Sequence, residues 1–124
     1  MASDATALGV DGPLAGKVFH GAFTWAAWFF RRFVREEHVF TVEQAVRKLT
    51  AQAAARLNLS DRGVLREGAC ADVVAFDPDT YGDQGTLNDP NRLAQGMAHV
   101  VVNGVAERQN GQITGDRNGH VLRR

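Results

Sequence analysis

The sequence predicts an α+β fold in which two helices precede a small antiparallel sheet. Aromatic and aliphatic side chains recur at helical spacing across residues 22–37. Thr41 and Gln44 stand in a helix-start pattern ahead of a second apolar stripe. Asn103-Gly104 separates two short segments, 99–102 and 105–109, and predicts a hairpin, because both turn positions favour positive φ.

The first expected helix is apolar on nearly every face, which indicates that other parts of a fold cover it. Most of the aromatic side chains of the chain lie between Phe19 and Phe40. The most apolar window, residues 18–30, is shorter than the ~20 residues needed to cross a bilayer. We therefore expect a buried helix and no membrane partner.

The second helix is expected over residues 41–58. The Thr41 hydroxyl can accept the Gln44 N–H, and the Gln44 side chain can reach back to the Thr41 amide. One apolar stripe then follows, made of Val42, Ala45, Val46, Leu49, Ala53 and Leu57.

Short strands occupy the last part of the chain. Residues 73–76 form an apolar run between two aspartates, which predicts a buried strand. A polar loop of about fifteen residues, 81–95, follows. The hairpin pairs residues 99–102 with 105–109, and Asn110-Gly111 predicts a second turn before residues 112–114.

Composition places bounds on function. The 124 residues carry 14 basic and 14 acidic side chains, so the net charge is zero and no nucleic-acid or membrane-surface partner is indicated. The single cysteine, Cys70, excludes an internal disulfide framework and a zinc site built from several thiolates. Cys70 is expected to be an inert packing residue, and the absence of a signal-peptide pattern favours the cytoplasm.

Local motifs in the sequence do not indicate an enzymatic activity. The four histidines, His20, His38, His99 and His120, show none of the tight spacings typical of metal ligands. The glycines match no phosphate-binding loop, and no G-x-S-x-G motif occurs. On composition alone, Asp4 is a solvated acid or a turn former.

A longer ordered pattern resembles a known family. The segments are Thr41-Val-Glu-Gln-Ala-Val-Arg-Lys-Leu-Thr50, Ala54-Ala-Arg-Leu-Asn-Leu59, Asp61-Arg-Gly-Val-Leu-Arg-Glu-Gly68 and Ala71-Asp-Val-Val-Ala-Phe-Asp77. Together they resemble the carboxyl-terminal part of the amidohydrolase superfamily. Ser3-Asp4, Asp11-Gly-Pro-Leu14 and Val34-Arg-Glu-Glu37 are most similar to its N-acyl-D-amino-acid deacylases, the D-aminoacylases.

The resemblance implies the last portion of a zinc-dependent hydrolase. Residues 1–60 would end a (β/α)₈ barrel with two helices, and residues 61–124 would supply the carboxyl-terminal strands of a small β-sandwich. The reaction implied is hydrolysis of an N-acyl-D-amino acid to a carboxylate and a D-amino acid. Asp4 would take a proton from a metal-bound water, pass it to the leaving amine and contribute to the metal site.

The chain also departs from the pattern of this family. The earlier strands that carry its other metal ligands have no counterpart here, so we expect no tightly bound zinc and no activity from this chain alone. Gly21-Ala22 follows His20 where relatives often have Pro and Arg, which leaves His20 a weak candidate for substrate binding.

Loss of the barrel also predicts uncovered surface. Trp25, Trp28, Phe29 and Phe30 would lose their cover, and the strands from Val73 and His99 would present open edges.

Three alternatives remain open. The chain is a hydrolase segment completed by the remainder of the amidohydrolase polypeptide, or it is a non-catalytic α+β module that self-associates through its aromatic helix. In the third, Met1 is a mis-assigned start within a longer gene product.

Overall fold

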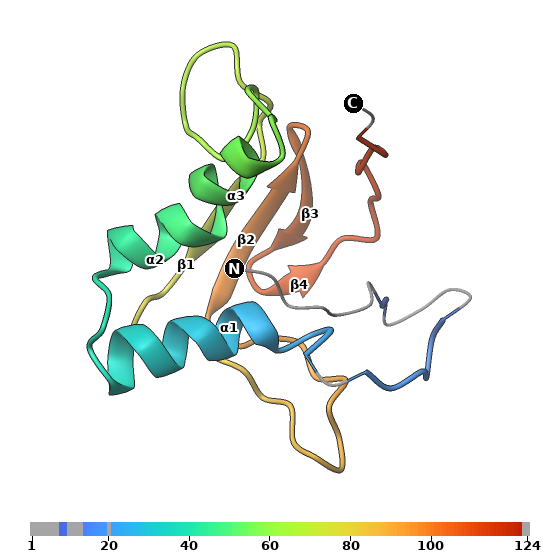
Figure 1. The fold of residues 1–124 in the computed structure, drawn as a ribbon. Coiled ribbons are helices and arrows are strands. Elements are labelled where there is room, and N and C mark those ends of the chain that lie inside the picture. Colours follow the sequence, from blue (N-terminus) through green and yellow to red (C-terminus); the bar gives the residue numbers. More distant parts are fainter. Residues whose placement is uncertain (1–7, 10–13, 20, 123–124) are drawn as a thin grey trace. The chain divides into compact units, whose positions relative to one another are not determined.

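The computed structural model describes residues 8–9, 14–19 and 21–122, which form short helices and one antiparallel sheet (Figure 1). The elements in chain order are α1 (Trp25–Phe30), η1 (Arg31–Glu36), α2 (Val42–Leu49), α3 (Ala51–Arg56), β1 (Val73–Phe76), β2 (Met97–Val102), β3 (Val105–Gln109) and β4 (Gln112–Ile113). They belong to two compact units. Unit 1 contains Met1–Val46 and Pro78–Gly96, and unit 2 contains Arg47–Asp77 and Met97–Arg124.

The first expected helix forms, but its boundaries and geometry differ from the prediction. Gly21 has φ of 96° and begins a turn that continues to Thr24, so the helix starts at Trp25 rather than at residue 22. From Arg31 the helix widens into the π-helical segment η1, where the Glu37 N–H donates to the Arg32 carbonyl at 2.9 Å. Within the described residues, no helix is long and apolar enough to cross a membrane.

The core of unit 1 is aromatic. Phe29 and Phe30 are fully buried, so the expectation that these two rings would be uncovered is wrong. Phe29 packs against Phe33 and Phe40, and Phe30 meets the ring of Tyr81 edge-on at 5.4 Å. Trp25 is half-buried, whereas Trp28 is 44% exposed, as expected for a helix that lacks part of its cover.

The predicted second helix begins as expected. The Gln44 N–H donates to the Thr41 hydroxyl at 3.3 Å, and the Thr41 N–H donates to the Gln44 side-chain oxygen at 3.0 Å. This reciprocal pair satisfies two amides that the helix leaves unpaired.

The prediction of one continuous helix to residue 58 is wrong, because Thr50 separates α2 from α3. Thr50 adopts φ −125° and ψ −93°, outside the helical region. Gly63 approaches so closely that a Cβ placed there would lie 3.0 Å from the Thr50 carbonyl carbon. The returning loop therefore packs against the break, where a β-branched residue gives little intrinsic support to a helix.

The end of α3 lies where the composition predicts it. Asn58 takes a left-handed conformation with φ of 56°. The Leu59 N–H donates to the Ala54 carbonyl at 2.9 Å, and the Asn58 N–H donates to the Ala55 carbonyl at 3.2 Å. These two bonds make the Schellman motif, which satisfies carbonyls left free at a helix end.

The sheet has the strand order β1-β2-β3-β4 with antiparallel pairing throughout. The predicted hairpin is confirmed, with Asn103 and Gly104 at φ of 48° and 84°. The second turn, at Asn110-Gly111, is confirmed as well.

Two expectations about the sheet are corrected. The strand 73–76 is not buried, since Val74 is 50% exposed. Of the two expected open edges, β1 lies at one side of the described sheet, but the strand containing His99 is paired on both sides. Successive side chains of a strand point to opposite faces of the sheet, so each face must be covered for the strand to be buried. Among the described residues, the face on which Val74 lies lacks this cover.

Two glycines allow the close approach of the loop to the helix break to be tested. Gly63 and Gly68 have nearly equal φ, 78° and 79°, but a Cβ at Gly68 would meet no atom within 4 Å. Both alanine variants incur the left-handed strain of about 1–2 kcal/mol, and Gly63→Ala adds a backbone clash. We expect Gly63→Ala to lower the urea midpoint clearly more than Gly68→Ala. Equal midpoints would show that the contact at Thr50 does not constrain unit 2.

Candidate functional site

The two residues that the sequence singles out for the reaction, Asp4 and His20, lie outside the described residues. The structure therefore does not describe the position of either residue. It does describe the backbone that flanks His20 on both sides, and this backbone belongs to unit 1.

The described residues do not form a metal centre. Across 8–9, 14–19 and 21–122, no group of three or more His, Cys, Asp or Glu side chains is placed to hold an ion. A catalytic zinc needs about three protein ligands. The described side chains therefore do not fit a zinc site on their own.

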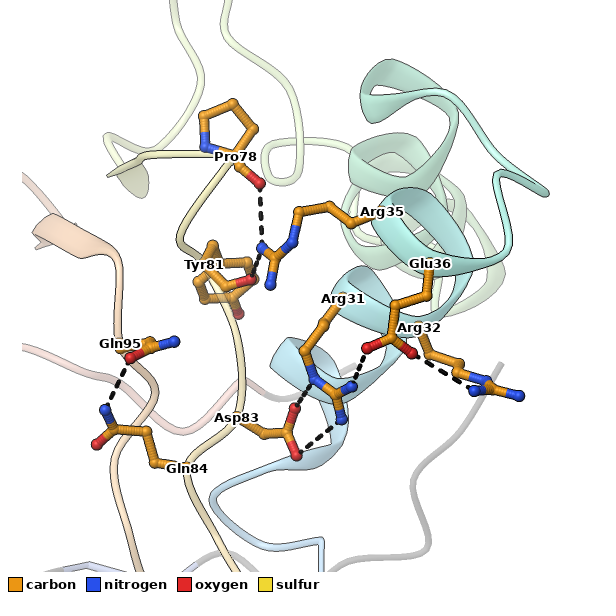
Figure 2. Close-up of polar contacts among 9 residues, drawn as sticks. All are labelled: Arg31, Arg32, Arg35, Glu36, Pro78, Tyr81, Asp83, Gln84 and Gln95. Carbon is orange, nitrogen blue, oxygen red and sulfur yellow. Dashed lines mark hydrogen bonds and ion pairs between the residues drawn. The ribbon is translucent and has the colours of Figure 1, made fainter.

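The most developed polar cluster of unit 1 is an arginine pair on η1 (Figure 2). Arg31 Nε donates to Asp83 at 2.7 Å, and its guanidinium also contacts Glu36. Arg35, one turn later, donates to the Pro78 carbonyl at 3.1 Å and to the Tyr81 carbonyl. Figure 2 shows both guanidinium groups directed from the helix toward the segment 78–83.

The contacts of this cluster attach the segment 78–83 to η1 and do not form a catalytic arrangement. The hydrogen bond to Asp83 raises the pKa of Arg31 above its ordinary value, so the guanidinium stays charged at any physiological pH. Asp83 is 13% exposed, which reduces solvent screening of the pair. The arginine pair therefore fixes one end of the long loop to the helix.

The loop is also closed at its base. The Gln95 N–H donates to the Gly82 carbonyl at 3.0 Å, and the side chains of Gln84 and Gln95 are joined at 2.9 Å (Figure 2). A Cβ at Gly96 would lie 2.5 Å from the Tyr81 nitrogen, so glycine permits this closure. The predicted loop 81–95 is thus held closed at its base by the bonds between residues 82–84 and Gln95.

Unit 2 has its own polar network around Arg62. Its guanidinium contacts the carboxylate of Asp72 and donates to Asn103 at 3.0 Å. Asp72 in turn accepts the Asn103 N–H at 2.8 Å, and the Asn103 amide donates to the Asn118 carbonyl. Asn103 therefore joins the hairpin turn to the loop before β1 and to the segment after β4.

An open hollow of about 520 Å³ lies beside α3 in unit 2. Its lining consists of Ala51, Ala55, Asn58, Leu59, Ser60, Arg62, Val64 and Arg66. Arg66 donates to the Ser60 carbonyl at 2.6 Å, and Arg62 is paired with Asp72, so both cations already have partners. The hollow shows no acid, base or nucleophile arranged for a reaction.

Cys70 is half-buried, and its thiol donates to the Asp61 carboxylate at 3.2 Å. This hydrogen bond, together with burial, raises the pKa of Cys70 above its usual range. Because the thiolate is the nucleophile, a raised pKa reduces reactivity at neutral pH. The geometry agrees with the interpretation of Cys70 as an inert residue.

Sequence reasoning missed the arginine pair and its partner Asp83. The four-residue spacing of Arg31 and Arg35 was an available signal, because it places both side chains on one helical face. Nothing local in the sequence pointed to Asp83 as their partner.

Comparison with known proteins shows which family this chain resembles. The model of the amidohydrolase family matches residues 2–106. The N-acyl-D-glutamate deacylase of Alcaligenes xylosoxydans xylosoxydans is 49% identical over 75 residues, which are 60% of this chain and 15% of that protein. The D-aminoacylase of the same organism is 41% identical over 92 residues, covering 74% and 19%.

Solved structures give the same relationship. An N-acyl-D-glutamate deacylase from Bordetella bronchiseptica, complexed with zinc and a phosphonate mimic of the tetrahedral intermediate, matches with a TM-score of 0.63 at 40% identity. The match covers 70% of this chain and 20% of that one. A D-aminoacylase mutant in complex with CuCl₂ matches with a TM-score of 0.71 at 38% identity, covering 77% and 21%. This chain thus spans about a fifth of these relatives.

The pairing of Cys70 with Asp61 predicts a pH dependence of alkylation. The folded chain should react slowly with iodoacetamide at pH 7.5, with a rate midpoint above the ordinary thiol pKa of about 8.5. Asp61→Asn removes the charged acceptor, so the pKa should fall and the rate at pH 7.5 should rise. Glu67→Gln, at an exposed acid of the same loop, is the control. A midpoint for Asp61→Asn equal to or above that of the unmodified chain would contradict the assigned hydrogen bond.

Proposed function

Because this chain belongs to the amidohydrolase family, we propose that it is the carboxyl-terminal segment of a zinc-dependent hydrolase that cleaves N-acyl-D-amino acids. The products are a carboxylate and a D-amino acid. The observation that carries the proposal is the similarity to the deacylase complexed with zinc and a tetrahedral-intermediate mimic, which extends over 70% of this chain.

The contribution of this chain to the reaction is the carboxylate of Asp4. An aspartate with an ordinary pKa near 3.9 is ionised at neutral pH and can accept a proton. It can then return that proton to a departing amine, which is otherwise a poor leaving group. Asp4 lies within the segment 2–106 that matches the family.

The described residues contain no group of three or more side chains that could hold a metal ion, so a complete centre would need ligands from elsewhere. We therefore propose that this chain alone does not bind zinc tightly and does not turn over substrate. The complete centre would require the remaining part of an amidohydrolase polypeptide.

A chimera tests the role of Asp4. The matching segment of the Alcaligenes N-acyl-D-glutamate deacylase would be replaced by this chain, and hydrolysis of N-acetyl-D-glutamate measured. We expect turnover from the chimera and a loss of at least about 100-fold in kcat on Asp4→Asn, the size of effect typical of a general acid or base. Asp116→Asn, at an exposed acid outside the matching segment, should leave kcat unchanged. Full activity of the Asp4→Asn chimera would overturn the assignment.

The purified chain by itself provides a second test. Equilibrium dialysis against zinc should give no stoichiometric tight binding, and N-acetyl-D-glutamate should not be hydrolysed. Stoichiometric zinc together with turnover would show that the chain is catalytically self-sufficient.

Self-association through the aromatic helix is the second candidate function, favoured by the 44% exposure of Trp28. If the chain is such a module, light scattering after size exclusion should show a discrete dimer, and Trp28→Arg should convert it to monomer. Leu87→Arg, at an exposed loop position, is the matched control. A monomer, or an aggregate without a sharp thermal transition, would reject the module.

A further inference from the structure

Three Asn-Gly pairs lie in unit 2, and the two hairpin turns account for only two of them. The pairs are Asn103-Gly104, Asn110-Gly111 and Asn118-Gly119. Asparagine is a thermolabile residue, because the amide nitrogen of the following residue can attack its side-chain carbonyl carbon. A following glycine favours this attack, since it has no Cβ to shield the nitrogen. The contacts of the three pairs differ, so their reactivity should differ as well.

The pair Asn103-Gly104 is held at both reacting groups. The Asn103 side-chain oxygen accepts from Arg62 at 3.0 Å, and its side-chain nitrogen donates to the Asn118 carbonyl. The Gly104 N–H donates to the Ala71 carbonyl at 3.0 Å. Attack requires the glycine nitrogen to lose its proton and approach the side-chain carbon in a suitable orientation. Both groups are engaged elsewhere in the folded chain, which protects Asn103.

The pair Asn110-Gly111 is held at only one reacting group. The Gly111 N–H donates to the Ala98 carbonyl at 2.9 Å, which occupies the attacking nitrogen. The Asn110 side chain is exposed and makes no hydrogen bond within the part of the chain that the structure describes. This pair should therefore show intermediate protection.

The pair Asn118-Gly119 is free at both reacting groups. It follows β4 in a segment that is neither helix nor strand (Figure 1). Across residues 8–9, 14–19 and 21–122, neither the Asn118 side-chain amide nor the Gly119 N–H has a hydrogen-bond partner. A Cβ added at Gly119 would meet no atom within 4 Å. The backbone here has the room to bring the nitrogen toward the side-chain carbon.

We propose that Asn118 is a site of spontaneous deamidation, whereas Asn103 is protected by its hydrogen bonds. The Gly119 nitrogen forms a bond to the Asn118 side-chain carbon, and the bond from that carbon to its own amide nitrogen breaks. The Gly119 proton leaves with this nitrogen as ammonia. Water then opens the cyclic imide at either carbonyl, giving aspartate or isoaspartate. The net reaction consumes water and releases ammonia.

The reaction would alter the contacts that hold the segment after β4. The Asn118 N–H donates to Glu107 at 2.7 Å, and the Asn118 carbonyl accepts from Asn103. Isoaspartate lengthens the main chain and displaces this carbonyl. Either product also adds a carboxylate to the residue bonded to Glu107, and like charges at short range repel. Deamidation should therefore loosen this segment from the hairpin turn.

Timed incubation of the purified chain at mildly alkaline pH tests the site. Trypsin separates the three pairs into the peptides 93–108, 109–117 and 118–123, because each is bounded by arginines. Mass spectrometry then follows the conversion of each amide to an acid. Digestion in heavy-oxygen water marks any conversion that occurs during digestion itself. The same incubation in concentrated urea gives the rate of each pair without the fold.

We expect the folded rate at Asn118 to lie within about threefold of its rate in urea. One hydrogen bond should slow Asn110 about 3- to 10-fold, and three should slow Asn103 at least about 10-fold. Asn118→Gln is the control, and it should abolish the conversion in peptide 118–123. The assignment is overturned if Asn118 is not the fastest of the three in the folded chain, or if Asn103 reacts equally fast folded and in urea.

The structural consequence has its own measurement. Asn118→Asp reproduces one product, and it should speed amide hydrogen exchange across residues 114–122 about 3- to 10-fold. Asn110→Asp, at an exposed asparagine of the same unit, is the matched control and should leave this exchange unchanged. Equal exchange in Asn118→Asp and the unmodified chain would overturn the proposed loosening.

Discussion

Burial of Phe29 and Phe30 is the constraint from which the arrangement of unit 1 follows. Two adjacent phenylalanines on one helix face different directions, so both can be covered only if separate segments pack against the helix. Phe33 and Phe40 cover one ring, and Tyr81 from the distant loop covers the other. Burial of each such ring contributes about 1.5–3 kcal/mol, more than a surface ion pair supplies.

The arginine pair on η1 then determines where the loop attaches. Arg31 pairs with a carboxylate, whereas Arg35 satisfies two backbone carbonyls that a loop would otherwise leave to water. The π-helical widening begins at Arg31 itself. Such widened turns often occur near functional sites, and this one carries the two arginines that hold the loop.

Local patterns in the sequence predicted much of the fold. The reciprocal Thr41–Gln44 bonds and the Asn103-Gly104 turn depend on a few neighbouring residues, so they could be read directly from the sequence. The break at Thr50 could not, because the residue packed against it, Gly63, comes from a later loop. The cover over Phe30 was missed for the same reason, since Tyr81 lies about fifty residues further on. For the candidate site, family resemblance supplied Asp4 and His20, while the Arg31–Asp83 pair spans 52 residues, too great a separation for any local pattern to reveal.

The two units are interleaved along the chain, since each consists of two stretches separated by part of the other. During synthesis on the ribosome, unit 1 cannot be completed until Gly96 has emerged, although its aromatic helix is already made when Glu36 has been added. The ring of Tyr81 is made after this helix, so the nascent helix exposes Phe30 until residue 81 has emerged. Neither unit can be expressed as an uninterrupted stretch of the gene, and a nonsense codon at position 78 would leave both units incomplete.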